Sequence, residues 1–120
     1  MKIKEENIVL EKAHKFAQRI VKLYKYLTDE KHEFVLSRKM LDDGTDIGGF
    51  IKIAQEAESH DMFTRDMGTA LRKCSRTDFW LQLLLDGGYL DQAQFDSIDA
   101  DNQELFRLLT KIVKSAKGLR

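Results

Sequence analysis

The chain of 120 residues contains no proline and a single cysteine, and its 20 basic residues balance its 20 acidic ones. One cysteine excludes an internal disulfide, and the neutral sum argues against a protein built mainly to bind phosphates. No segment has the length of a membrane span or a secretory signal, so we expect one all-helical cytoplasmic domain over residues 1–120.

The first predicted helix runs from about Asn7, which can cap it, to Leu27. Its apolar residues keep a heptad-like spacing: Val9, Ala13, Phe16, Ile20, Leu23 and Leu27. Residues 28–31 form a short turn, so the next helix should return antiparallel beside the first.

The second predicted helix begins near His32 and must cross residues 42–49, a stretch rich in aspartate and glycine that local rules would make a loop. Its apolar residues are Phe34, Met40, Leu41, Ile47, Ile51 and Ala54. Positions 40, 44, 47, 51 and 54 share one face, so we expect the helix to continue. On this interpretation Gly44 and Gly48 let a neighbouring helix approach closely.

The third predicted helix is capped by Ser59 and stops at Gly87-Gly88. Its inner stripe is Phe63, Met67, Ala70, Cys74, Thr77, Leu81 and Leu84. A capping box of Asp91 and Gln94 opens the fourth helix. The inner face of that helix is Phe95, Ile98, Leu105, Leu109, Ile112 and Ala116. The pattern predicts an antiparallel up-down four-helix bundle.

Asn102 interrupts the inner face of the fourth helix, which leaves open a break or kink near Asp99 to Asp101.

Phe79, Trp80 and Leu83 lie off the inner stripe of the third helix, which therefore carries more apolar surface than one core requires. Exposed apolar area of this kind is typical of protein interfaces. The sequence therefore favours a scaffold or adaptor that assembles with itself.

No pattern of catalytic or metal-binding residues is present. His14, His32 and His60 are scattered, and no base is spaced to activate Cys74. Residues 42–49 lack the lysine of a phosphate-binding loop and the ordered oxygen ligands of an EF-hand. We therefore predict no catalytic residue, metal or cofactor, and no enzyme.

Basic residues form stripes along the first and fourth helices: Lys12, Lys15, Arg19, Lys22 and Lys25, and then Arg107, Lys111, Lys114 and Lys117. Such stripes are more often solvated helix faces, but together they could contact phosphates. Tyr24 and Tyr26 could stack on bases or pack on a neighbouring subunit. RNA binding, or an accessory role to a reverse transcriptase, is the alternative function.

Several short segments carry a resemblance to a known family. They are residues 44–48 (GTDIG), 54–59 (AQEAES), 79–84 (FWLQLL), and Phe63 with Ala70-Leu71. The chain resembles the bacterial four-helix-bundle proteins encoded in intervening sequences of large-subunit ribosomal RNA genes. This resemblance implies a ring-like pentamer without enzymatic activity. Relatives include accessory proteins of diversity-generating retroelements, which bind a reverse transcriptase and nucleic acid.

The chain departs from the family pattern mainly in residues 42–54. Asp42, Phe50 and Ile53 stand where the family has arginine, asparagine and glutamate, and Asp46 replaces a serine. In the third helix, glutamates of the family pattern are replaced by Lys73 and Arg76. The apolar register is intact, so we expect the family fold, and we assign Phe50 to the oligomer interface with Phe79, Trp80 and Leu83.

Overall fold

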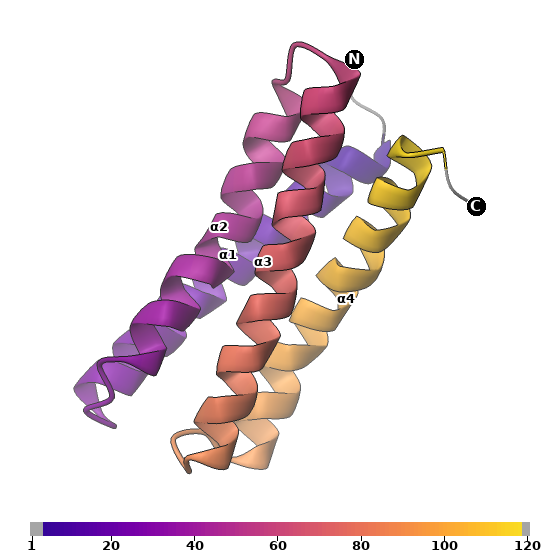
Figure 1. Cartoon of the computed structure of the whole chain (residues 1–120). Helices are drawn as coiled ribbons and strands as arrows, with labels where there is room; N and C mark the ends of the chain where they lie inside the picture. Colours follow the sequence, from indigo (N-terminus) through magenta and orange to yellow (C-terminus); the bar gives the residue numbers. More distant parts are fainter. Residues whose placement is uncertain (1–3, 119–120) are drawn as a thin grey trace.

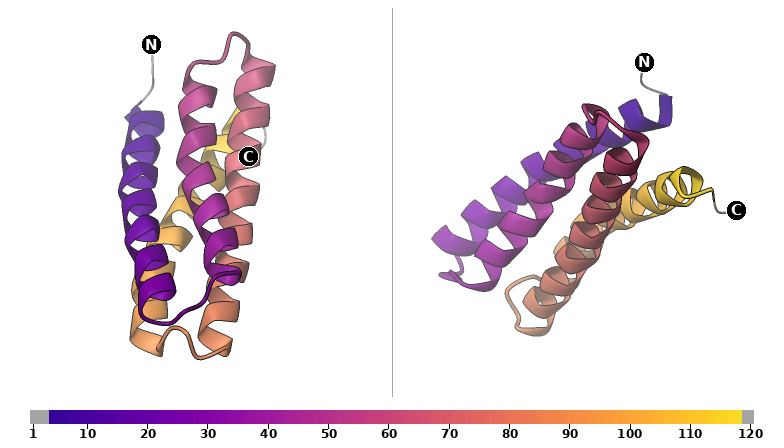
Figure 2. Two further views of the ribbon diagram at one scale, coloured as in Figure 1. Left: turned by 90° about the vertical axis from the view of Figure 1, so that its left-hand side faces the viewer. Right: turned by 45° about the horizontal axis from the view of Figure 1, so that its top comes forward.

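A computed structural model describes residues 4–118, with side chains from Asn7 onward. It contains four helices, α1 (Lys4–Asp29), α2 (Leu36–Gln55), α3 (His60–Asp86) and α4 (Gln92–Ala116). Successive helices run antiparallel, and α4 returns to pack on α1 (Figures 1 and 2). The predicted all-α, antiparallel up-down four-helix bundle is confirmed, with principal extents of 44 × 24 × 20 Å.

The predicted inner faces meet in one core. Only a few of their members remain partly exposed, such as Leu23, Phe63 and Ala116. The helix also continues through the glycines, as predicted. A Cβ added at Gly44 would lie 3.0 Å from Ile20 Cγ1, so the missing side chain is what lets α2 approach α1.

The predicted stops and caps between α2 and α4 are confirmed. Ser59 accepts the backbone N–H of Met62, and Asp91 forms a complete capping box with Gln94. Gly88 adopts a left-handed φ of 79° after the end of α3.

The predicted beginnings of α1 and α2 are wrong. Helix α1 already includes Lys4, so Asn7 lies inside it and does not cap it, and α1 continues to Asp29. Helix α2 begins at Leu36 and not near His32, so Phe34 lies in the preceding loop with 63% of its surface exposed.

Glu33 explains the later start of α2. Its buried carboxylate accepts the backbone N–H groups of Val35, Leu36 and Ser37 at 3.2, 3.0 and 2.6 Å. Burial alone would raise the pKa of Glu33, but these donors outweigh it and hold the pKa below its usual value. A long acidic side chain thus takes the place of a short capping residue.

Helix α4 is unbroken through Asp99 to Asp101, so the break that Asn102 left open does not occur. The amide of Asn102 is buried, but its Nδ2 donates to the carbonyl oxygen of Cys74 at 3.0 Å. Cys74 Sγ in turn donates to Asn102 Oδ1 at 3.1 Å. These bonds satisfy the buried amide of Asn102 across the contact between α3 and α4, so α4 accommodates this polar residue without a break.

Candidate assembly interface

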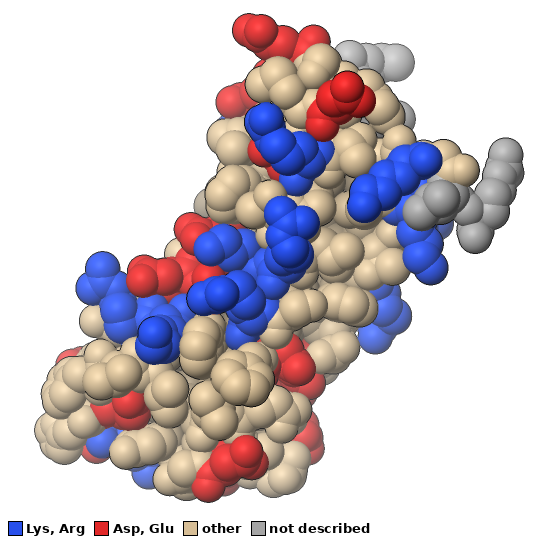
Figure 3. Space-filling view, in the orientation of Figure 1, with Lys and Arg blue, Asp and Glu red and all other residues tan. Residues whose placement is uncertain are grey.

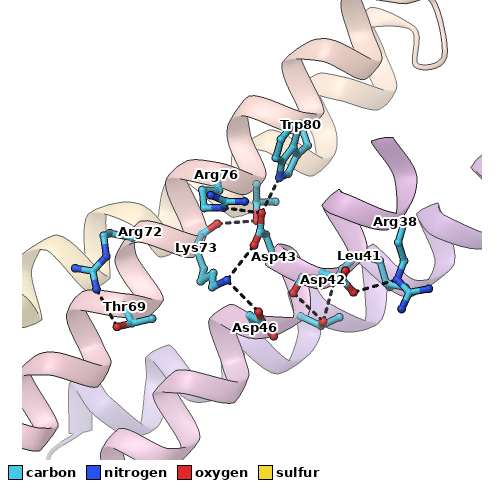
Figure 4. A network of polar contacts seen from close by, with 12 residues as sticks. Arg38, Leu41, Asp42, Asp43, Asp46, Thr69, Arg72, Lys73, Arg76 and Trp80 are labelled. Atoms are coloured by element: carbon cyan, nitrogen blue, oxygen red, sulfur yellow. Dashed lines mark hydrogen bonds and ion pairs between the residues drawn. The ribbon is translucent and has the colours of Figure 1, made fainter. Parts of the chain in front are cut away.

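A buried carboxylate organises the contact between α2 and α3 (Figure 4). Asp43 is 4% exposed, and its Oδ2 accepts Trp80 Nε1–H at 2.7 Å and Arg76 Nε–H at 3.0 Å. Its Oδ1 lies 3.2 Å from Lys73 Nζ, which also contacts Asp46 at 3.2 Å. These four partners form a network that fixes the tryptophan on the outer side of the two helices.

The network keeps both of its central groups charged. Burial would raise the pKa of Asp43, but hydrogen bonds from Trp80, Arg76 and Lys73 hold it below its usual value. Burial would likewise lower the pKa of Lys73, but Asp43 and Asp46 raise it. The contact between α2 and α3 is therefore ionic near neutral pH.

Of the four predicted interface residues, Phe79 is the most exposed, at 57%. Its ring and the Trp80 ring meet in an edge-to-face arrangement with centroids 5.3 Å apart. Trp80 and Leu83 are partly buried, and Trp80 packs on the core of its own chain. Phe50 also packs on that core, two turns of α2 beyond Asp43 and away from the end that carries Phe79. The structure therefore brings three of the four residues together and leaves Phe50 apart.

A basic surface covers the middle of α2 and α3 (Figure 3). Its members are Arg38 and Lys39 on α2 and Arg65, Arg72, Lys73 and Arg76 on α3. Lys39 Nζ and Arg76 Cζ lie 5.3 and 5.8 Å from the centroid of the Trp80 ring. Sequence reasoning missed this surface, although the spacing of Arg65, Arg72 and Arg76 already places them on one side of a helix.

The predicted basic stripe on α1 is partly neutralised by α4. Arg19 Nη1 contacts Asp101 Oδ2 at 2.6 Å, and Lys12 Nζ contacts Glu104 Oε2 at 3.3 Å. Lys15 pairs with Glu11 on its own helix. Two of the positive charges that the sequence offered as possible phosphate contacts are thus paired with acidic residues of α4.

Two grooves border the predicted stripes. One, of about 550 Å³, lies between α1 and α4 and is lined by Arg19, Lys22, Leu23, Ala93, Gln94, Ser97 and Ile98. The other, of about 340 Å³, runs along α4 and is lined by Phe106, Arg107, Thr110, Lys111 and Lys114. The structure therefore gathers the predicted residues of α4 around one partly exposed aromatic ring.

Within residues 4–118, no three His, Cys, Asp or Glu side chains are grouped so that they could hold a metal ion. Among the same residues, no helix combines the length and apolar character needed to cross a bilayer. The buried Cys74 thiol has its pKa raised to about 12, first by burial and then by the charges of Asp78 and Asp99. This thiol is therefore protonated and unreactive at neutral pH.

Comparison with curated proteins finds no match. A solved structure is 40% identical, with a TM-score of 0.91, and covers 92% of this chain and 98% of its own. It is a protein of unknown function from the S23 ribosomal protein family of Bacteroides thetaiotaomicron. Comparison with protein families matches residues 5–111 to the 23S rRNA-intervening sequence proteins, and indicates no enzyme family. The chain therefore belongs to the 23S rRNA-intervening sequence protein family.

Proposed function

We propose that this protein is a non-enzymatic scaffold or adaptor that assembles with copies of itself through the outer face of α3. The observation that carries this proposal is Phe79, which is 57% exposed about two turns before the end of the long helix α3. Its neighbour Trp80 is held by Asp43, so the aromatic pair is already ordered before a partner binds. Such preorganisation lowers the entropic cost of association.

Five subunits are the number that the family resemblance implies. Two different complementary patches on one chain give a closed ring when successive rotations between subunits add up to a full turn. No additional contact is needed to close the ring. Trp80 and Leu83 would border Phe79 in this assembly, and Phe50 would lie at a distance from the centre of the contact.

The test is the mass in solution, measured by light scattering on a sizing column, for the native chain and for Phe79→Glu. We expect a native assembly near five subunits and a monomeric variant, because a buried unpaired carboxylate opposes association. Phe34→Glu is the matched control, since Phe34 is 63% exposed in the loop before α2, away from α3. A monomeric native chain, or equal effects of the two variants, would contradict the proposal.

RNA binding, or an accessory role to a reverse transcriptase, is the second candidate. The observation that favours it is the groove on α4, where Arg107 and Lys114 flank the partly exposed ring of Phe106. A base could stack on the ring while the cations meet phosphates. The predicted α1 residues Lys12, Lys15, Arg19 and Lys22 contribute less, because three of them are ion-paired.

Titration of a labelled single-stranded RNA at low salt tests this candidate. Arg107→Glu with Lys114→Glu should weaken binding by about tenfold or more and flatten its salt dependence. Lys15→Glu with Lys22→Glu, on α1, is the control and should have a smaller effect. No binding by the native chain below physiological salt would contradict this function.

A further inference from the structure

Helix α3 presents an outward row of cations, which we name the arginine face: Arg65, Arg72 and Arg76, with Lys39 of α2 beside them. Arg65 and Arg76 each reach an aspartate through Nε, yet their side chains remain 64% and 60% exposed. Arg72 donates to the hydroxyl of Thr69. The outer nitrogens of these guanidinium groups are therefore available for a partner, and Phe79 continues the same side of α3 by one turn.

The first half of α4 carries the opposite charge. Every charged residue from 86 to 104 is acidic. Arg19 and Lys12 of α1 neutralise Asp101 and Glu104 on one flank. On the other flank lie Asp78 of α3 with Asp96 and Asp99 of α4, which we name the carboxylate face, and no ion pair among residues 7–118 reaches these three.

The carboxylate face is electrostatically strained within one chain. The pKa of Asp99 is raised to about 6, first by burial and then by its hydrogen bond to Asp78 and by the negative charges of Asp78 and Asp96. Gln103 donates to Asp78 at 3.3 Å but carries no charge. Such a cluster gains most from an outside cation, because its members repel one another until one arrives.

We propose that copies of this chain bind head to tail, with the arginine face of one copy against the carboxylate face of the next. Charge complementarity selects this partner, since guanidinium forks match carboxylates in geometry as well as charge. Each face also carries an exposed aromatic ring, Phe79 beside the arginines and Phe106 beside the carboxylates. The inference rests on the proposed self-assembly and deepens it by naming the second surface of the contact.

Two pairs of substitutions reverse charge at the centre of each face and leave Asp43, Asp78 and Asp99 unchanged. Thr69→Glu with Arg72→Glu lowers the formal charge of the arginine face by three, and Asp96→Lys with Ala100→Lys raises that of the carboxylate face by three. Each pair alone should weaken association by about tenfold or more. In the chain that carries all four changes, the new glutamates of one copy can pair with the new lysines of the next, so this chain should recover the native mass.

Mixing gives an independent readout. Each double variant binds itself weakly, but each keeps the native face that the other has lost, so an equimolar mixture should associate more strongly than either variant alone, with unlike chains alternating. Alternation permits only even numbers of subunits in a closed ring. The native assembly itself should dissociate as salt rises from about 0.1 to 1 M, because exposed charges are screened.

Lys22→Glu with Lys25→Glu is the matched control, since both lysines are exposed on α1, away from the two faces. It should leave the mass of the assembly unchanged, while circular dichroism verifies that every variant is helical. Native mass in both double variants, or no recovery in the fourfold variant, would overturn the inference while leaving the proposed self-assembly intact. A native chain that is monomeric would overturn both.

Discussion

Helices α2 and α4 occupy equivalent positions, each between two neighbours, but they use their charges differently. On α2, Gly44 packs directly against Ile20 of α1, and the buried Asp43 accepts hydrogen bonds from three residues of α3. On α4, the polar contacts with α1 include two ion pairs whose side chains are about 40% exposed, and Asp99, beside α3, lies among like charges. The buried carboxylate of α2 is thus neutralised by donors of its own chain, whereas Asp99 of α4 lies beside like charges, which the proposed contact between copies would offset.

Asp43→Ala removes the centre of the polar network between α2 and α3 and should destabilise the chain more than any of the substitutions that follow. It removes the acceptor of Trp80, Arg76 and Lys73, and we expect a loss of about 2–3 kcal/mol in the free energy of unfolding. The value lies below that of a fully buried pair because Arg76 is 60% exposed and can bind water. Urea unfolding measures it, with Asp42→Ala, whose carboxylate is 59% exposed, as a control near zero.

Gly44→Ala probes the contact of α2 with α1. The new methyl group would meet three carbons of Ile20 at 3.0–3.2 Å, so we expect a destabilisation of about 1 kcal/mol. Gly49→Ala is the control, because nothing lies within 4 Å and helix propensity should stabilise it by about 0.5–1 kcal/mol. Equal thermal midpoints for the two variants would show that α2 is not closely packed on α1.

Asp99→Asn should sharpen the description of α4, because it removes a charge that its surroundings oppose. The folded pKa of about 6 exceeds the unfolded one, so the folded chain holds more protons between about pH 4 and 6 and loses stability as the pH rises. We expect the variant to be about 1 kcal/mol more stable at pH 7.5 and no more stable at pH 4. The free energy of unfolding is measured by urea in the Phe79→Glu background, so that association does not contribute. A variant that is more stable at pH 4 but not at pH 7.5 would contradict the prediction.

Arg19→Ala tests the contact of α4 with α1 and should have the smallest effect. Arg19 contacts Asp101 Oδ2, Ser97 O and Ser97 Oγ, but it is 40% exposed, so we expect a loss of about 0.5 kcal/mol. The loss should shrink further at high salt. A loss as large as that of Asp43→Ala would abolish the distinction between α2 and α4.

The sequence predicted the fold because each helix repeats its own pattern. Ser59, Gly88 and the Asp91 capping box mark their ends by local chemistry, and the apolar stripes mark the core. The prediction failed at the beginning of α2, where a long side chain acts as the cap. Glu33 caps α2 by reaching forward to three backbone N–H groups, which short-residue capping rules do not describe.

The candidate site was predictable only in part. Phe79 stood out because it falls off an apolar stripe, which is a property of one helix. The role of Trp80 depends on Asp43, 37 residues away, and the neutralisation of Arg19 depends on Asp101, 82 residues away. Periodicity within a helix carries no information about which charge on another helix will lie opposite.

The departures from the family pattern are paired in space. Asp46 on α2 stands at a serine of the family pattern and contacts Lys73 on α3, which stands at a glutamate. Lys73 and Arg76, both at glutamate positions, also contact the buried Asp43. Glutamates at 73 and 76 would have placed like charges beside Asp43, so the basic residues on α3 match the acidic ones on α2.

The buried thiol of Cys74 is a built-in probe of how often the contact between α3 and α4 opens. Cys74 is the chain's one cysteine. It is fully buried where α3 meets α4, and its S–H group donates a hydrogen bond to Asn102 Oδ1. A thiol reagent reaches it only when these helices part, so the labelling rate reports the frequency of that local opening without any engineered probe. Binding of another copy across α4 would then be read directly as slower labelling.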